Sequence, residues 1–122
     1  MAPRETWQPV FDKYKVDVAL TGHVHNYQRS LPIRGFKPGT TDGQVVAAGP
    51  SGEPTAESGT VYVVCGGAAA DLYGVDPPSS CEFSKFTEEI HHYAVIEIDD
   101  RSLKYRAVRL DGSEMDAFTY TK

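Results

Sequence analysis

The sequence predicts one α/β domain that is rich in β-structure, with a helix near its N-terminus and an antiparallel meander near its C-terminus. Three observations lead to this prediction. One segment has the apolar spacing of an amphipathic helix, two short β-branched segments end at glycine, and three later segments are joined by turn residues. The 122 residues fit one domain and leave no room for two well-packed ones.

The helix is predicted over residues 4–15. Its apolar side chains recur at the i, i+3, i+4, i+7 spacing of one helical face and are Trp7, Val10, Phe11 and Tyr14. Thr6 is a possible N-cap with Pro9 in the first turn, and Pro3 is an alternative start.

Two strands are predicted on either side of a long loop. Residues 16–20 form a short buried strand that stops at Gly22, whereas residues 27–33 contain Pro32 and therefore form an edge strand or irregular chain. Residues 34–59 show no hydrophobic period and predict a surface excursion with a short hairpin around Val45 and Val46.

The most strongly predicted strand covers residues 60–65, which are β-branched or aromatic and are followed by Gly66 and Gly67. A second loop is expected over residues 68–86. The meander follows, with strands predicted over residues 93–98, 103–110 and 115–121 and hairpin signals in the connections 99–102 and 111–112.

Composition excludes several classes of protein. The net charge of −5 argues against a protein that coats nucleic acid, because such domains carry a basic surplus. The longest apolar stretch, residues 61–70, is about half the length needed to cross a bilayer. Cys65 and Cys81 either form one disulfide or are a buried thiol and a loop thiol; the sequence leaves both open.

The histidines are the leading candidates for chemistry. His23 and His25 follow a predicted strand, and in an extended segment their spacing puts both rings on one side, at the strand end where α/β sheets bind ligands. Neutral imidazole is the commonest metal ligand, although an H-x-H pair also arises by chance. His91 and His92 are adjacent, so in a strand they point to opposite faces, and a structural or exposed role is expected.

Residues 16–30 closely resemble the last motif of the calcineurin-like metallophosphoesterases. They are most similar to the purple acid phosphatase branch, in which a G-H-x-H motif precedes a tyrosine and an arginine. The matching residues here are Gly22, His23, His25, Tyr27 and Arg29. The preceding helix, the strand with its Gly-Gly end and the closing Phe118-Thr119-Tyr120 extend the resemblance, which covers residues 4–30 and 59–67 and, less specifically, 90–122.

The resemblance implies a dinuclear metal centre, with divalent or Fe/Zn/Mn-type ions, that hydrolyses phosphoric esters in an αββα sandwich. His23 and His25 would ligate one metal each, and Gly22 would let the backbone turn sharply so that both rings reach the centre. Asn26, Tyr27 and Arg29 are candidates for orienting these ligands. The residues alone favour strand packing for Tyr27 and a solvated charge for Arg29. An extracytoplasmic or secreted location is also implied.

The three earlier ligand motifs of that family, D-x-H, G-D and G-N-H, do not occur in the sequence. Residues 1–122 are therefore expected to be a single partial domain, the C-terminal, β-rich half of the sandwich. Its expected partners are the missing N-terminal half and a phosphoester substrate, with no nucleic acid and no membrane. The chain alone should be inactive, bind metal weakly at most, and either self-associate or cover its open sheet face with loops. The alternative is a free-standing, non-catalytic β-rich binding domain.

Overall fold

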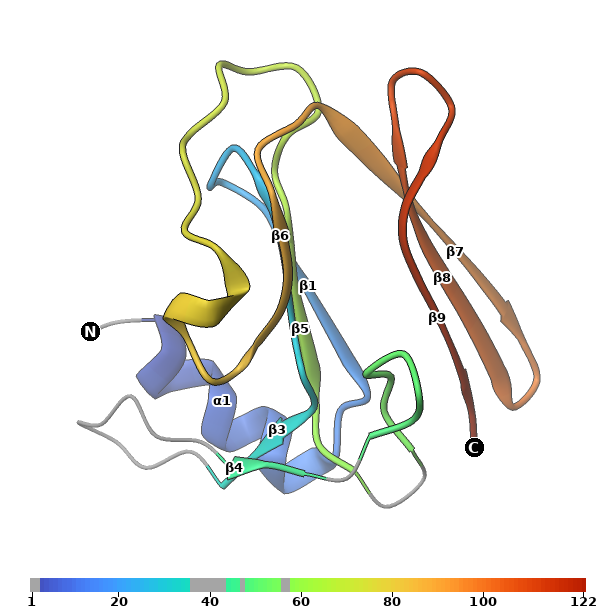
Figure 1. Cartoon of the computed structure of the whole chain (residues 1–122). Coiled ribbons are helices and arrows are strands. Elements are labelled where there is room, and N and C mark those ends of the chain that lie inside the picture. Colours follow the sequence, from blue (N-terminus) through green and yellow to red (C-terminus); the bar gives the residue numbers. More distant parts are fainter. Residues whose placement is uncertain (1–2, 36–43, 47, 56–57) are drawn as a thin grey trace.

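The computed structural model describes residues 3–35, 44–46, 48–55 and 58–122 (Figure 1). The elements in chain order are α1 (Pro3–Tyr14), β1 (Val18–Thr21), β2 (Tyr27–Ser30), β3 (Ile33–Arg34), β4 (Gln44–Val45), β5 (Val61–Cys65), the 3-10 turn η1 (Pro78–Ser80), β6 (Ser84–Glu88), β7 (His92–Asp99), β8 (Ser102–Arg109) and β9 (Glu114–Thr121). Within these residues, no helix has the length and apolarity needed to span a membrane.

A four-stranded sheet in the order β1-β5-β2-β6 carries the first histidine pair. β1 and β5 run parallel, with Leu20 beside Val63, and the other pairs are antiparallel. The prediction that residues 27–33 form an edge strand or irregular chain was wrong for β2, which lies between β5 and β6. β2 ends at Ser30, so Pro32 lies outside the ladder and removes no hydrogen bond from it.

The second loop was also predicted too long, because residues 84–86 belong to β6. The short hairpin predicted around Val45 and Val46 is present in part, because β4 pairs with β3 and places Val45 beside Ile33. Its connection, residues 36–43, lies outside the described residues. Cys65 is half-buried and Cys81 is exposed, and both thiols are free.

The predicted meander is confirmed. β7, β8 and β9 form an antiparallel sheet, and each strand begins one residue before the predicted start. Gly112 has a φ of +87° in the second turn, which suits the Asp-Gly signal because glycine enters the left-handed region without steric cost.

The core lies between the two sheets, which pack face to face in Figure 1. Tyr27, Val61 and Val63 from the first sheet meet Tyr105 and Phe118 from the meander, and the last two rings stack with centroids 4.9 Å apart. Because side chains alternate along a strand, Tyr62 and Val64 point to the opposite face.

That opposite face is covered in part by loop. The segment around η1 lies over it and leaves a cavity of about 400 Å³, lined among others by Val64, Val75 and Phe83. This agrees with one of the two expected outcomes, in which loops pack over the open face; self-association stays a prediction.

Helix α1 begins and ends one residue before the predicted bounds. Its predicted apolar face is largely exposed, with 56% of Trp7 and 68% of Tyr14 accessible to solvent. Phe11 is the member that packs inward, with its ring centroid 6.1 Å from that of Tyr62. The described residues therefore bury only part of a face whose spacing indicates full burial.

Candidate functional site

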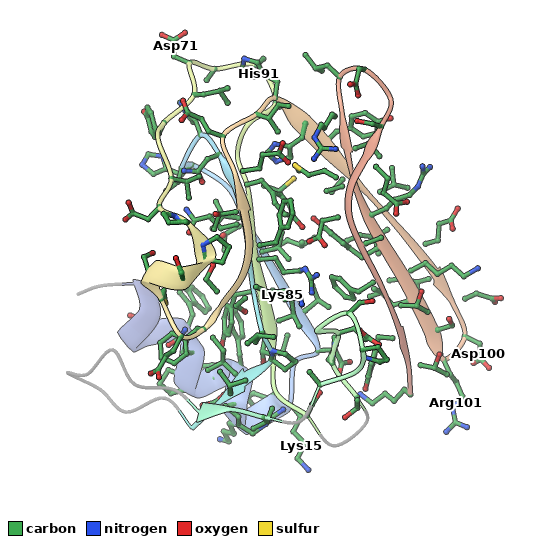
Figure 2. The ribbon with its side chains drawn as sticks, in the orientation of Figure 1. Lys15, Asp71, Lys85, His91, Asp100 and Arg101 are labelled. Atoms are coloured by element: carbon green, nitrogen blue, oxygen red, sulfur yellow. The ribbon has the colours of Figure 1, made fainter. Side chains whose placement is uncertain are left out.

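The first candidate residues lie in residues 22–26, here called the His loop, which joins β1 to β2. The loop follows the carboxyl end of β1, where it is parallel to β5, and such strand ends are the usual ligand-binding edge of α/β sheets. In Figure 1 the chain leaving β5 arches over this loop, and Figure 2 shows Asp71 and His91 at the same end of the molecule.

The His loop is tightly bent. The Val24 N–H donates to the Gly22 carbonyl at 2.9 Å, and the Asn26 N–H donates to the Val24 carbonyl at 2.9 Å. His23 is the central residue of the turn between Gly22 and Val24, and its φ is +72°. A positive φ at this position is typical of the rarer and more strained form of γ-turn. The expectation of an extended segment was therefore wrong, and the left-handed residue is His23 rather than Gly22.

Gly66 and Gly67 each allow a close approach of other residues, Gly66 of the His loop and Gly67 of residues 90–92. A β-carbon at Gly66 would overlap the Val24 carbonyl oxygen, and one at Gly67 would lie 2.8 Å from the Ile90 carbonyl oxygen. The Gly66 N–H also donates to the Asn26 carbonyl at 3.3 Å. Gly66 therefore does more than end β5, because it lets the His loop backbone approach that strand end.

His25 is held by the segment that arches over the loop. Its Nδ1 lies 2.7 Å from the carbonyl oxygen of Asp71, and its ring stacks on Tyr73 with centroids 4.3 Å apart and planes 20° apart. A carbonyl only accepts hydrogen bonds, so Nδ1 carries the proton and Nε2 of the neutral ring keeps its lone pair. Histidines that ligate metals usually donate their other N–H in this way.

His23 is exposed and makes no hydrogen bond to any described residue. Across residues 3–35, 44–46, 48–55 and 58–122 there is no cluster of three or more His, Cys, Asp or Glu side chains able to hold a metal ion. Zinc sites take three or four protein ligands, so the described residues supply two donors and not a complete site.

Asn26 joins the His loop to the arching segment. Its side chain is buried, and Nδ2 donates to the carbonyls of Tyr73 and Gly74 at 3.4 and 3.3 Å. Its Oδ1 accepts from Gln28 Nε2 at 2.9 Å. The amide thus fixes the distance between the two segments that meet at His25.

Tyr27 and Arg29 point from the face of β2 that packs against the meander, and both contact Asp116. The Tyr27 hydroxyl donates to Asp116 Oδ2 at 2.7 Å, and Arg29 donates from Nε at 2.6 Å and from Nη2 at 2.8 Å. Arg29 also donates to the carbonyls of Ser51 and Gly52. Interpreting Arg29 as a solvated charge was therefore wrong, because its side chain is only 2% exposed.

Burial sets the protonation of this cluster. It raises the pKa of Tyr27 far above its usual range, with Tyr105 and Asp116 adding to the effect, so the hydroxyl stays protonated and donates. Burial likewise raises the pKa of the Cys65 thiol, which favours an inert, protonated sulfur.

The other two histidines have structural contacts. His92 is buried, donates from Nδ1 to the Ile90 carbonyl at 2.7 Å, and lies edge-on to Tyr27 with centroids 5.2 Å apart. His91 donates from Nδ1 to the Gly67 carbonyl at 3.0 Å. They contact different groups, as expected for adjacent residues at a strand start.

Sequence reasoning missed Asp71, Tyr73 and Asp116. The first two lie in a stretch without hydrophobic period, so no signal marked them. Asp116 did carry a signal, since it shares one strand face with Phe118 and Tyr120, and a carboxylate on an apolar face requires a partner.

A scan against models of protein families gives no match. "Probable inactive purple acid phosphatase 27" of Arabidopsis thaliana is 42% identical over 69 residues, which are 57% of this chain and 10% of the relative. "Purple acid phosphatase 19" of the same plant is 32% identical over 104 residues, which are 81% of this chain and 24% of the relative.

The structure is similar to that of a purple acid phosphatase isolated from yellow lupin (Lupinus luteus) seeds. The TM-score is 0.65 at 28% identity, over 93% of this chain and 19% of that one. The chain thus spans between a tenth and a quarter of these proteins, from 10% to 24%.

Proposed function

Because this chain is similar over most of its length to one part of the purple acid phosphatases, we propose that it is the C-terminal part of a metal-dependent phosphoric ester hydrolase. In this proposal the G-H-x-H loop supplies ligands to a dinuclear metal centre. The observation that supports it most is His25, whose Nδ1 donates to the Asp71 carbonyl while Nε2 is left free for a metal.

In the intact enzyme His23 and His25 ligate one metal each. Such a metal pair, when bound, supplies Lewis acidity and an activated water for attack on the phosphoric ester. The strained turn at His23 supports this role, because backbone strain tends to persist at functional sites. Asn26 fixes the His25 backbone to the arching segment.

Tyr27 and Arg29 support the His loop from the strand that follows it, β2. Their shared partner Asp116 ties β2 to the meander, so the strand that carries the loop is anchored on its buried face. These two residues therefore hold the loop in place and do not reach towards a metal or substrate.

The remaining ligands come from the missing N-terminal half of the catalytic domain. β1 is at the edge of the described sheet, and 49% of Leu20 is exposed there. The apolar face of α1 is exposed as well, through Trp7, Val10 and Tyr14. An unpaired edge strand and an exposed apolar helix face are surfaces that further strands and helices of the same domain can cover.

Calorimetry with Zn²⁺ tests the ligand assignment. We expect weak binding to this chain that disappears in the His23→Ala/His25→Ala double variant. Affinity should also fade as the pH falls, because protonated imidazole cannot ligate. Sub-micromolar binding that survives the double substitution would assign the metal to other residues and overturn the proposal.

Phosphate release from p-nitrophenyl phosphate tests the activity. This chain should be inactive. The longer parent should be active and should lose most of that activity with either single His→Ala change, since one metal then lacks a ligand. An active isolated chain, or a parent indifferent to both changes, would contradict the proposal.

A non-catalytic β-rich binding domain is the second candidate function. One observation favours it: several of the relatives are themselves named probable inactive purple acid phosphatases. An inactive parent that still folds would select this candidate. An extracytoplasmic or secreted location, which the family resemblance implies, stays a prediction.

A further inference from the structure

We propose that Tyr73 is a positioning residue for His25. Its ring and the Asp71 carbonyl together hold the imidazole in the Nδ1–H form, with Nε2 free, before any metal arrives. Only the purpose of this orientation, which is metal binding, rests on the proposed function. The orientation of the ring itself can be measured in the metal-free chain.

The first step is the stacking geometry. The rings of His25 and Tyr73 are nearly parallel, 20° apart, with centroids at 4.3 Å. Rotating the imidazole about its Cβ–Cγ bond would tilt it into the tyrosine ring, so the stack resists that rotation. Half of Tyr73 remains exposed, at 50%. The part that is covered includes the ring face that contacts His25.

The second step is the backbone that brings the two rings together. The Tyr73 N–H donates to the His25 carbonyl at 2.9 Å, and the Tyr73 carbonyl accepts from Asn26. Tyr73 is therefore fixed to the His loop through both its backbone N–H and its backbone carbonyl. The stack is the side-chain part of a docked contact and not a chance approach of two mobile loops.

The third step is the tautomer. With the ring held flat on Tyr73, Nδ1 faces the Asp71 carbonyl at 2.7 Å and must donate to it. Without the stack, the imidazole is free to turn, Nδ1 loses its acceptor, and the Nε2–H form becomes accessible. That form cannot ligate through Nε2, so Tyr73 acts on metal affinity through His25 alone.

The test uses this chain without metal, labelled with ¹⁵N at histidine, and reads the tautomer from two-bond ¹H–¹⁵N spectra at a pH where imidazoles are neutral. The variants are Tyr73→Phe, which keeps the ring, and Tyr73→Leu and Tyr73→Ala, which remove it. Tyr93→Ala is the matched control, because Tyr93 is also 50% exposed but lies on β7. Circular dichroism confirms that each variant is folded.

We expect His25 to be a single Nδ1–H tautomer in the unaltered chain, in Tyr73→Phe and in Tyr93→Ala, and a mixture in Tyr73→Leu and Tyr73→Ala. Zn²⁺ should bind the last two about tenfold more weakly, which is the usual loss when a group that orients a metal ligand is removed. A pure Nδ1–H signal in Tyr73→Leu, or a mixture already present in Tyr73→Phe, would overturn the inference.

The two proposals can fail separately. If the tautomer changes as expected but no variant binds Zn²⁺ through His25, the positioning role stands and the proposed metal site is wrong. If Zn²⁺ binds through His23 and His25 with the same affinity in every Tyr73 variant and the tautomer is unchanged, the metal site stands and the positioning role is wrong.

Discussion

Removing Arg29 should be among the most destabilising single changes in this chain, because it leaves a buried carboxylate without its cation. The side chains of Arg29 and Asp116 are 2% and 8% exposed. Two charged hydrogen bonds of 2.6 and 2.8 Å join them. Their burial separates this pair from the surface ion pairs that contribute little to stability.

The size of the loss follows from these contacts. In Arg29→Met, Asp116 keeps the Tyr27 hydroxyl and one backbone N–H but loses its cation, which costs about 3–5 kcal/mol for a buried pair. A domain of this size is stable by about 5–15 kcal/mol, so the variant loses a large share. In Arg29→Met/Asp116→Leu neither charge is left alone, so the cost should fall short of the sum of the single changes by about 1–3 kcal/mol.

Urea unfolding followed by far-ultraviolet circular dichroism measures all four members of this cycle. Arg109→Met is the matched control, because Arg109 and Glu88 have the same fork geometry but are 25% and 29% exposed. The control should lose far less stability, and its loss should shrink with added salt. A cost below about 1 kcal/mol for Arg29→Met, or single effects that add within about 0.5 kcal/mol, would refute the reasoning.

Three further predictions concern the core, the His loop and the helix. Burial raises the pKa of Tyr27 and Tyr105, so folding stability from these protonated hydroxyls is intact below about pH 10 and falls above it, by up to about 2.7 kcal/mol per pH unit for the two. Absorbance at 295 nm should then show Tyr27 and Tyr105 ionising only when the chain unfolds at alkaline pH. Ionisation of both in the folded chain at the usual tyrosine pKa of about 10 would contradict this. Gly66→Ala should destabilise the chain, because the new methyl overlaps the His loop, whereas Gly22→Ala meets open space; equal melting temperatures would be the contrary result. Trp7→Ser should reduce binding of a hydrophobic dye and any self-association seen in sedimentation, because Trp7 is 56% exposed, and an unchanged dye signal would place the exposed patch elsewhere.

Local patterns predicted most of the elements. β-branched residues marked β5, the Asp-Gly pair marked the second turn of the meander, and spacing located α1 to within one residue at each end. Each of these signals is contained in a few neighbouring residues, so it can be found without knowing the partner strand.

β6 could not be predicted because its sequence, Ser-Lys-Phe-Thr-Glu, has no strong apolar alternation. Its strand conformation depends on pairing with β2, whose position in the sheet was misjudged because of Pro32. A proline two residues past a strand end leaves the ladder intact, so the bounds of the strand decide its effect.

The site was predicted in part for the same physical reason. The G-H-x-H motif marked the His loop, but the groups that orient it are far away in sequence. Asp71 is 46 residues from His25, and Asp116 is 87 residues from Arg29. Only the fold brings these groups together, and a stretch such as residues 71–74 has no period of its own that could reveal it.

The open edge of β1 bears on how the chain behaves by itself. Natural sheets protect free edges with lysine, proline or a bulge, and β1, with the sequence Val-Ala-Leu-Thr, has none of these. No strand of the described residues pairs with the outer edge of β1, so its backbone is a template for strand addition by a second copy. In the proposed parent the same edge is needed to continue the sheet. The Leu20→Lys change would accordingly keep the separate chain soluble. In the proposed parent the same change would interrupt assembly of the whole domain. The edge that makes the separate chain prone to association is therefore the edge that the parent needs for strand pairing.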